Sequence, residues 1–437
     1  MDTIYALSSG KLPSGVAVIR ISGQQVRFVV ETICKNMPKP RTLMLSTFLA
    51  VDGSIIDRGL VCYFGQPHSF TGEDCAEFHC HGSIAVVRAL LARLSKFEGL
   101  RAADAGEFTK RAFLNGKIDL TSAEGLSDLL AAETEGQRKL AISQADGGLK
   151  ALYDGWRQRL VQLRSMVEAA IDFSEEDDVA IRAMKSLLSG SGALITEISA
   201  HVGNYRSVEI IQDGFRVVIL GAPNAGKSSL LNALAGREVA IATEEAGTTR
   251  DLIDVRLELG GNLVIVTDTA GIRDDAGQVE KIGIARARER AAVADLVLLT
   301  RDVSNPVGLA GSYSGVDNLC VGLQIDKLAP SELNADGFDV LVSAKTGAGL
   351  SLLIDLIASR AESATASGGL APGRERQVSL LHIVIDCLKP IATLEFDDID
   401  LIGEQLRRAT DALGRITGRV DVEDLLDVIF SQFCVGK

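Results

Sequence analysis

Three patterns of hydrophobic and polar positions are visible along the chain. Over residues 1–117, short β-rich runs such as Gly15–Ile21 and Gly59–Phe64 alternate with glycine and proline, which predicts a small α+β domain. Over residues 118–212, apolar residues recur at three- and four-residue steps, the spacing of one helical face. We expect the core of a helical bundle to contain Leu149, Leu152, Trp156, Leu160, Leu163, Val167 and Ile171.

The third pattern, over residues 213–360, alternates apolar runs with helical stretches and predicts βα units on a mostly parallel sheet, in a domain expected to extend over 213–365. The apolar runs are FRVVIL, NLVIVTD, ADLVLL, NLCVGLQI and DVLVSA, and a helical SLLNALAG follows the first. Residues 361–373 are rich in Ala, Ser, Gly and Pro, which indicates a linker. After it, one helical face holds Leu401, Ile402, Leu406, Ala409, Leu413 and Ile416. The simplest arrangement is a discontinuous helical domain, built from 118–212 and 366–437, with the α/β domain inserted between its halves. The predicted fold class is multidomain, α+β and α/β.

Composition narrows the possible function classes. The chain has 437 residues, 46% of them hydrophobic, with a mean hydropathy of +0.19, so it can bury more than one core. No apolar run reaches the roughly 18 residues that span a bilayer, and the first residues lack a secretory signal. We therefore expect a cytoplasmic protein without membrane association. The seven scattered cysteines indicate reduced thiols rather than a disulfide framework.

The charge of the chain limits how it can bind nucleic acid. The net charge is −13 and the pI is near 5.0, whereas a general nucleic-acid coat protein is basic. If this chain binds RNA, a local basic patch or a partner protein must supply the positive charge.

A phosphate-binding loop is predicted at Gly221–Ser228, with the sequence GAPNAGKS, and is called the phosphate loop below. It follows an apolar strand at Val217–Leu220 and opens a helix at Ser229–Ala235, the context that the motif requires. The glycines let backbone N–H groups point at phosphate oxygens. Lys227 is expected to reach the β- and γ-phosphates, and the hydroxyl of Ser228 to ligate Mg²⁺.

Two further segments complete the predicted nucleotide site. Asp268-Thr-Ala-Gly271 ends the next apolar strand, where the Asp can hold Mg²⁺ through water and the Gly can donate its N–H to the γ-phosphate. Between that segment and the phosphate loop lies Ala246–Asp251, with the sequence AGTTRD. Its hydroxyls can complete the Mg²⁺ shell, and Thr249 is the candidate.

The residues that would recognise the base depart from the usual pattern. GTPases usually recognise guanine with N-K-x-D after a strand, and the corresponding residues here are Leu323-Gln-Ile-Asp326. Asp326 can accept from the guanine N1–H and amino groups, but the Asn and the stacking Lys are replaced, although Lys327 is near. Ser343-Ala-Lys345 fits a later backbone contact to the base. We expect guanine, bound more weakly than usual; the alternative, that Asp326 is an ordinary turn residue, stays open.

A group of Cys and His residues suggests a metal site, but its spacing argues against one. Cys75, His79, Cys80 and His81 lie on one expected strand, where His79 and His81 face one side and Cys80 the other. Four ligands cannot converge from that arrangement without a bulge, so we expect no metal here.

Short segments spread along the chain, from residue 2 to residue 437, all resemble segments of one protein family. They are Asp2–Ile4, Val18–Gly23, Ser69–Asp74, His81–Gly82, Gly106–Lys117, Ala246–Asp251, Asp268–Arg273 and Phe433–Lys437. With these segments the chain resembles the MnmE (TrmE) family of tRNA-modification GTPases, and the C-x-G-K tail together with a phosphate loop is highly specific. One departure is SSGKLPSG after the opening, where the family has a Gly-rich loop; it changes the rim of the implied folate pocket.

The resemblance implies both a fold and an activity. It implies an N-terminal domain that dimerises and binds a one-carbon tetrahydrofolate derivative, a discontinuous helical domain, and an inserted P-loop GTPase domain. Members of the family hydrolyse GTP to GDP with Mg²⁺ and K⁺, and their GTPase domains pair across the homodimer. They act with the FAD-containing MnmG (GidA) protein, as a heterotetramer. Together the two install an aminomethyl or carboxymethylaminomethyl group on the five-position of the wobble uridine in certain tRNAs.

By position, the resemblance also assigns roles to individual residues. The GTP-binding residues are Asn224, Ala225, Gly226, Lys227, Ser228, Ser229, Thr243, Thr248, Thr249, Asp268, Gly271, Asp326, Ser343, Ala344 and Lys345. The metal ligands are Ser228 and Thr249 for Mg²⁺, and Asn224, Thr243, Glu245 and Thr248 for K⁺. The catalytic residues are Lys227, Glu280, which orients the attacking water, and Cys434, and the folate-binding residues are Arg20, Glu77, Lys117 and Lys437. Without the resemblance, Glu280 is a surface helix residue and Cys434 a small packed residue.

Two other functions stay open at this point. A ribosome-assembly or signalling GTPase would use the same loop as a switch, but such proteins usually carry a basic RNA-binding appendage that this acidic chain does not show. A folate-binding aminomethyltransferase-like module would fit the N-terminal segments but would leave the phosphate loop unexplained.

Overall fold

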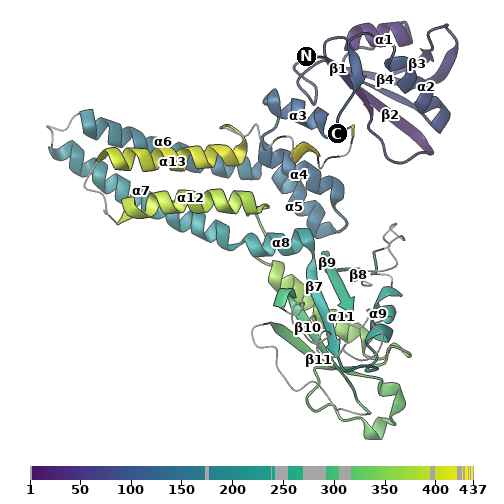
Figure 1. Cartoon of the computed structure of the whole chain (residues 1–437), viewed down its shortest axis with the longest axis vertical. Helices are drawn as coiled ribbons and strands as arrows, with labels where there is room; N and C mark the ends of the chain where they lie inside the picture. Colours follow the sequence, from purple (N-terminus) through teal and green to yellow (C-terminus); the bar gives the residue numbers. More distant parts are fainter. Residues whose placement is uncertain are drawn as a thin grey trace, which may run out of the picture. The chain divides into compact units, whose positions relative to one another are not determined.

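The structure of the chain, a computed structural model, divides into two compact units (Figure 1). It describes residues 2–172, 177–237, 239–241, 254–268, 292–304, 316–393 and 399–420, together with residues 426, 429–431, 433, 435 and 436. The first unit contains Met1–Ser127, Gln144–Ser191 and Asp386–Lys437, and the second contains Asp128–Ser143 and Gly192–Ile385. Among the described helices, none combines the length and the apolar character needed to cross a bilayer.

The first unit begins with a six-stranded sheet in the order β3-β4-β5-β2-β1-β6. Its strands are β1 (Thr3–Leu7), β2 (Ser14–Ser22), β3 (Met44–Leu49), β4 (Ile55–Phe64), β5 (Cys75–Gly82) and β6 (Leu100–Ala102). Neighbouring strands are antiparallel except β1 and β6. Two helices, α1 (Val26–Cys34) and α2 (Ile84–Leu94), pack on it through fully buried residues such as Val30 and Leu90. The α+β prediction for residues 1–117 is confirmed, and a third helix, α3 (Glu107–Leu114), ends this region.

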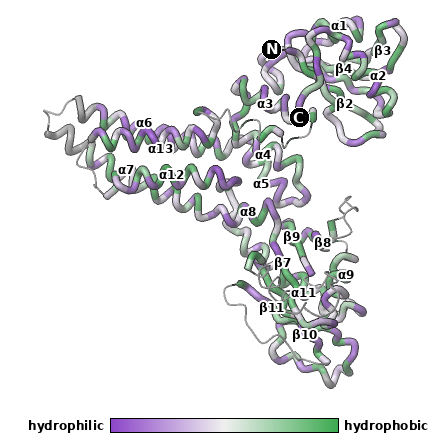
Figure 2. Tube along the Cα trace, in the orientation of Figure 1, coloured by the Kyte–Doolittle hydropathy of each residue, from purple (hydrophilic) through white to green (hydrophobic). Residues whose placement is uncertain are grey.

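Helices follow, as the three- and four-residue spacing predicts. They are α4 (Leu120–Ala131), α5 (Glu135–Ala145), α6 (Gly148–Asp172), α7 (Asp177–Gly203) and α8 (Tyr205–Asp213), and later α12 (Glu375–Ala392) and α13 (Ile399–Thr417). In the first unit α6 packs along α13, and polar and apolar residues alternate along both (Figure 2).

The buried faces of α6 and α13 differ from the predicted stripes at a few positions. Leu152 is half-buried, whereas its neighbour Tyr153 is only 1% exposed. Leu401 is 47% exposed, because successive residues point about 100° apart and the packed face is centred on Ile402 and Leu406. The side chain of Ile171 lies outside the described residues.

The second unit contains the α/β domain, whose sheet has the order β12-β11-β10-β7-β9-β8. Its elements are β7 (Phe215–Gly221), α9 (Lys227–Ala235), β8 (Asp254–Leu259), β9 (Asn262–Asp268), β10 (Leu296–Asp302), β11 (Asp317–Leu323), β12 (Val340–Val342) and α11 (Leu350–Thr365), with short 3₁₀ helices at Ile325–Lys327 and Pro330–Glu332. All neighbouring pairs are parallel except β8 with β9, so the prediction of a mostly parallel sheet is confirmed.

Both faces of this sheet are buried, which explains why its strands are apolar throughout. Along β7, Val217 and Ile219 pack with α9 and α11 on one face, while Val218 and Leu220 join a second cluster on the other. The predicted linker is wrong in its first part, since α11 continues to Thr365. Because the strands are parallel, the carboxyl ends of β7, β9, β10 and β11 lie at one edge, where α/β sheets bind ligands.

Candidate functional site

The phosphate loop joins β7 to α9, as predicted: Gly221 ends β7, and Lys227 and Ser228 begin α9. Its shape depends on Gly226, which caps α9 with a φ of +97°, a conformation that favours glycine. Asn224, two residues earlier, also has a positive φ, of +63°. The loop therefore leads directly into the first turn of α9, whose free N–H groups and dipole favour an anion.

The ammonium group of Lys227 is held inside the phosphate loop. Lys227 is only 6% exposed. Its Nζ donates to the backbone carbonyls of Gly221, at 3.0 Å, and Ala222, at 2.9 Å. Burial lowers the pKa of Lys227, and the nearby carboxylate of Asp268 opposes that shift. A buried cation at the start of a helix fits a phosphate ligand.

The structure brings together two of the predicted Mg²⁺-site residues. The Ser228 hydroxyl donates to Oδ2 of Asp268 at 2.7 Å, although the two residues are 40 apart in sequence. Asp268 ends β9 and is 3% exposed. A hydroxyl and a carboxylate oxygen next to a phosphate-binding loop are the hard donors that Mg²⁺ prefers, so the residues present fit this ion.

The residues that would recognise the base form a second loop, Leu323–Lys327, called the base loop below. Asp326 in this loop accepts from the hydroxyl of Ser343 at 2.7 Å. That hydrogen bond is the main reason why the pKa of Asp326 is lowered, with smaller contributions from Lys345 and Lys327. The hydrogen bond from Ser343 therefore favours the charged form of Asp326, which can accept hydrogen bonds. It also joins Asp326 to the segment Ser343–Lys345, which is expected from the sequence to lie beside the base.

The replaced residues of the base loop also have defined positions. Leu323, where the motif has Asn, is 1% exposed and belongs to the core of the sheet. Gln324, where the motif has Lys, donates from Nε2 to the backbone carbonyl of Asn224 in the phosphate loop at 3.0 Å. From the sequence, position 324 is only the site of a lost stacking residue, and this contact is not predicted. The sequence signal for this contact is that Gln324 occupies the second position of the segment that corresponds to N-K-x-D.

Two of the predicted folate residues, Arg20 and Glu77, are partners across β2 and β5. Their side chains form an ion pair with an N–O distance of 3.0 Å. The guanidinium of Arg20 also lies over the ring of Phe70, 5.6 Å from its centre. Glu77 makes a further contact to Nε2 of His79 at 3.3 Å.

The third described folate residue, Lys117, lies beside a cavity that Phe70 also lines. The cavity is about 380 Å³ and is lined by Arg41, Phe64, His68, Ser69, Phe70 and Lys117. The ammonium of Lys117 donates to the carbonyl of Pro67 at 3.1 Å. Aromatic rings with cationic side chains fit a flat, acidic ligand such as a folate.

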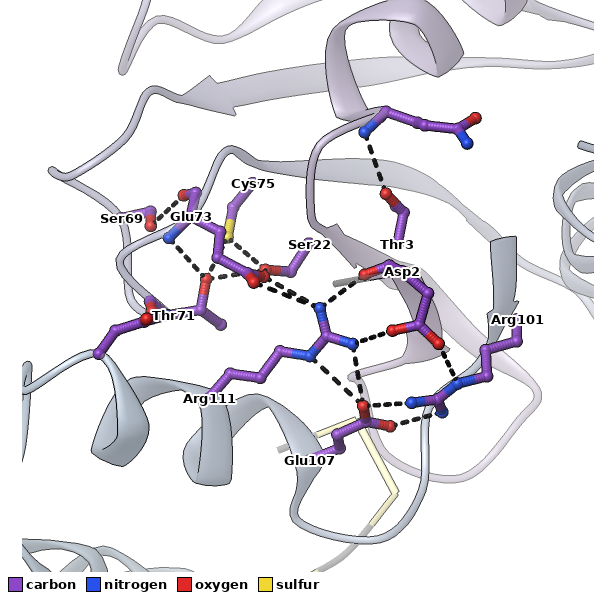
Figure 3. Close-up of polar contacts among 12 residues, drawn as sticks. Asp2, Thr3, Ser22, Ser69, Thr71, Glu73, Cys75, Arg101, Glu107 and Arg111 are labelled. Carbon is purple, nitrogen blue, oxygen red and sulfur yellow. Dashed lines mark hydrogen bonds and ion pairs between the residues drawn. The ribbon is translucent and has the colours of Figure 1, made fainter. Parts of the chain in front are cut away.

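Three segments of the first unit meet at Arg111 (Figure 3). Its guanidinium, 5% exposed as a side chain, contacts Asp2 at 2.7 Å, Glu107 at 3.0 Å and Glu73 at 3.1 Å. Arg101 adds a second guanidinium, whose Nη1 and Nη2 donate to the two carboxylate oxygens of Glu107 at 2.8 and 2.6 Å. We call these five residues the Arg111 cluster. Burial alone would raise the pKa of Glu107, but hydrogen bonds from Arg101, Asp104 N–H and Arg111 outweigh it and lower the pKa.

Comparison with known proteins gives matches along the whole chain. The model of the MnmE helical domain matches residues 120–434, and the model of the GTP-binding protein TrmE N-terminus matches residues 3–117. This chain belongs to the MnmE family. A protein of Brucella melitensis biotype 1, named tRNA modification GTPase MnmE, is 52% identical over 440 residues, covering 100% of this chain and 98% of its own length. A protein of Brucella canis with the same name matches with the same identity and coverage.

Among solved structures, the G domain of the T. maritima FeoB iron transporter aligns with 33% of this chain and 98% of its own length. The identity is 27% and the TM-score 0.24. A score this low adds nothing to the fold described above.

Several of the family's expected site residues lie outside the described residues. They are Thr243, Glu245, Thr248, Thr249, Gly271, Glu280, Cys434 and Lys437. Two described residues of the C-terminal tail are bonded to the first unit: Gly436 accepts from the hydroxyl of Ser8 at 2.8 Å, and Val435 bridges to Ala105. These contacts hold the backbone of the tail against the rest of the first unit at Val435 and Gly436.

The Cys and His residues of β5 have separate partners. Cys75 and Cys80 are buried, and Cys75 Sγ lies 3.1 Å from the hydroxyl of Thr71. His81 Nδ1 contacts Asp57 at 2.8 Å, and His79 contacts Glu77. Within the part of the chain that the structure describes, no three His, Cys, Asp or Glu residues are grouped so that they could hold a metal ion.

Proposed function

We propose that this member of the MnmE family is a potassium-dependent GTP hydrolase that takes part in tRNA modification. The arrangement of Lys227, Ser228 and Asp268 carries this proposal, because it joins a buried cation, a helix N-terminus and two hard oxygen donors. The relatives that match the full chain are named tRNA modification GTPases. That full-length match, with its N-terminal domain, favours this function over a switch GTPase.

The chemistry of the proposed reaction is phosphoryl transfer to water. A water oxygen bonds to the γ-phosphorus while the bond from that phosphorus to the oxygen bridging to the β-phosphate breaks, giving GDP and phosphate. Lys227 and the N–H groups of the phosphate loop balance the charge on the phosphate oxygens. Ser228 and Thr249 hold Mg²⁺, and Glu280 orients the water.

A potassium site is proposed at Asn224, Thr243, Glu245 and Thr248. Potassium supplies there the positive charge that an arginine finger supplies in other GTPases. Asn224 is exposed and follows the strand that enters the phosphate loop, so its amide oxygen is available as a hard donor.

The second half of the proposal concerns the modified base. With an FAD-containing MnmG-type partner and a tetrahydrofolate one-carbon donor, the protein installs an aminomethyl or carboxymethylaminomethyl group on the five-position of the wobble uridine. Arg20, Glu77, Lys117 and Lys437 hold the folate, and Cys434 serves the chemistry. We further propose a cytoplasmic homodimer with domains at 1–117, 118–212 plus 366–437, and 213–365.

Potassium dependence is tested by GTP turnover in KCl and in NaCl at equal ionic strength. We expect faster turnover in KCl, and Asn224→Ala should remove that advantage while most nucleotide binding remains. Asn232→Ala is the matched control, because Asn232 is an exposed residue of α9 outside the proposed site. Equal turnover of the unsubstituted protein in both salts would contradict the potassium site.

A further inference from the structure

Two residues of the nucleotide site have a left-handed backbone although neither is glycine. Asn224 in the phosphate loop has a φ of +63°, and Gln324 in the base loop has a φ of +65°. Elsewhere in the described part of the chain, only Lys35 and Arg41 share this conformation among non-glycine residues. A Cβ makes this conformation unfavourable, so it persists where neighbouring contacts hold it.

These two residues are joined directly. The side-chain amide of Gln324 donates from Nε2 to the backbone carbonyl of Asn224 at 3.0 Å, across 100 residues of sequence. The same side chain lies over the backbone of Gly226, since a Cβ added there would be 3.2 Å from Nε2 and 3.5 Å from Cγ of Gln324. Gln324 thus bonds to the phosphate loop at Asn224 and occupies the space where a side chain at position 226, directly before Lys227, would lie.

The backbone on either side of Gln324 is fixed by other contacts. Leu323 is buried in the core of the sheet, and Asp326 is bonded to Ser343. The base loop is therefore anchored before and after the residue that reaches the phosphate loop. A displacement of Gln324 would be transmitted to Asn224 through one hydrogen bond.

We propose that Gln324 is a positioning residue that fixes the phosphate loop from the base loop through the carbonyl of Asn224. This proposal rests on the proposed GTPase function and names a residue that determines how strongly the nucleotide binds. It differs from a role in contacting the base, because Gln324 acts on the phosphate-binding half of the site. A neutral amide can make this bond, and a lysine at the same position also ends in a donor.

The test uses the full chain with Gln324→Met, which keeps the length of the side chain but removes the donor, and Gln324→Lys, which restores a donor. Gln158→Met is the control, since Gln158 is an exposed residue of α6. Two constants are measured: the Kd of fluorescently labelled GDP, and the Ki of inorganic tripolyphosphate as its competitor. Tripolyphosphate has no base, so its Ki reports on the phosphate loop alone. The Lys variant is measured at low and high salt, because added charge matters less at high salt.

We expect Gln324→Met to raise both constants about threefold to tenfold, as for the loss of one hydrogen bond. Gln324→Lys should return the Ki of tripolyphosphate to within about twofold of the original value at high salt and should bind GDP at least as tightly as the unsubstituted protein. The control should change neither constant, and all variants should melt like the unsubstituted protein. A rise in the Kd of GDP with an unchanged Ki would make Gln324 a base contact and overturn the proposal. Unchanged constants in the Met variant, or no restoration by Lys, would also overturn it. If the unsubstituted protein bound no labelled GDP, the proposed function itself would fail.

Discussion

The phosphate loop and the Arg111 cluster both contain buried cationic side chains, but they use them differently. Lys227 donates to two backbone carbonyls, and burial lowers its pKa. Arg111 instead contacts three carboxylates and is joined to Arg101 through Glu107. In the first region the carboxylate of Asp268 opposes the effect of burial on the cation, whereas in the second the charges of the two guanidinium groups and the three carboxylates compensate one another. The phosphate loop is therefore suited to an anionic ligand, whereas the Arg111 cluster stabilises the fold of the first unit.

The largest effect is expected from Arg111→Met. Removing this guanidinium leaves the carboxylate of Glu73 without its cationic partner and Glu107 paired with Arg101 alone, which costs about 3–5 kcal/mol of unfolding free energy. Chemical denaturation of the full chain measures the loss. The control, Arg407→Met, breaks the exposed pair with Glu404 and should change nothing measurable. If Arg111→Met unfolded at the same denaturant concentration as the control, the cluster would not stabilise the unit.

The next largest effect is a pH dependence of unfolding that differs between the two units. Burial is the main reason why the pKa of His201 in the second unit is lowered, from 6.5 to about 4. Its unfolded state therefore binds a proton at a higher pH than its folded state, so this group's stabilisation is present above pH 6.5 and is lost as the pH falls to about 4. The loss is about 3 kcal/mol. Glu107 in the first unit, whose pKa is lowered, loses its stabilisation only at more acidic pH.

Unfolding measured between pH 7 and pH 4 checks this order. In the His201→Gln variant, stability should fall less over that range than in the unsubstituted protein. Parallel pH profiles for the two proteins would show that His201 is not the group responsible.

A smaller effect, on binding rather than stability, is expected from Lys227→Met. Loss of a charged donor to phosphate should weaken binding of labelled GDP about tenfold to hundredfold. The melting temperature without nucleotide should not fall, since the buried ammonium is removed together with its desolvation cost. A lower melting temperature with unchanged GDP affinity would reverse the roles assigned to the two regions.

The smallest effect on stability is expected from deleting Cys434–Lys437. The deletion removes the bond from Ser8 to Gly436 and the bridge from Ala105 to Val435, so about 1–2 kcal/mol of unfolding free energy should be lost. GTP turnover should be unchanged, because these contacts lie in the first unit. A loss as large as that of Arg111→Met would make the tail primarily structural.

The two regions also differ in how far the sequence could predict them. The phosphate loop is a contiguous run between a strand and a helix, so its position and elements follow from local pattern. The Arg111 cluster joins residues up to 109 apart, and no local pattern pairs Arg111 with Asp2. The segments that carry the family resemblance contain Asp2, Glu73, Glu107 and Arg111 but not Arg101, and they do not show which of these residues contact one another. The bond from Gln324 to Asn224 is non-local in the same way.

Two smaller errors in the predicted elements have causes in the local sequence. The antiparallel strand β8, with the sequence DVRLEL, was not predicted, because its alternating polar residues differ from the apolar runs of the parallel strands. The predicted linker included residues of α11 because its Ala and Ser content resembles a linker, although Ala361 is fully buried. The composition of these residues is typical of a linker, but their packing makes them the last turn of a helix.

The most direct test of the central claim is mass analysis of the nucleosides in tRNA from cells whose only copy of this protein carries Lys227→Ala. Cells with the unsubstituted protein and cells with the exposed Arg407→Met variant serve as controls. We expect the aminomethyl-type modification at the five-position of the wobble uridine to be lost in the Lys227→Ala cells and present in both controls. Normal modification in the Lys227→Ala cells, with the variant protein present at the normal level, would contradict it.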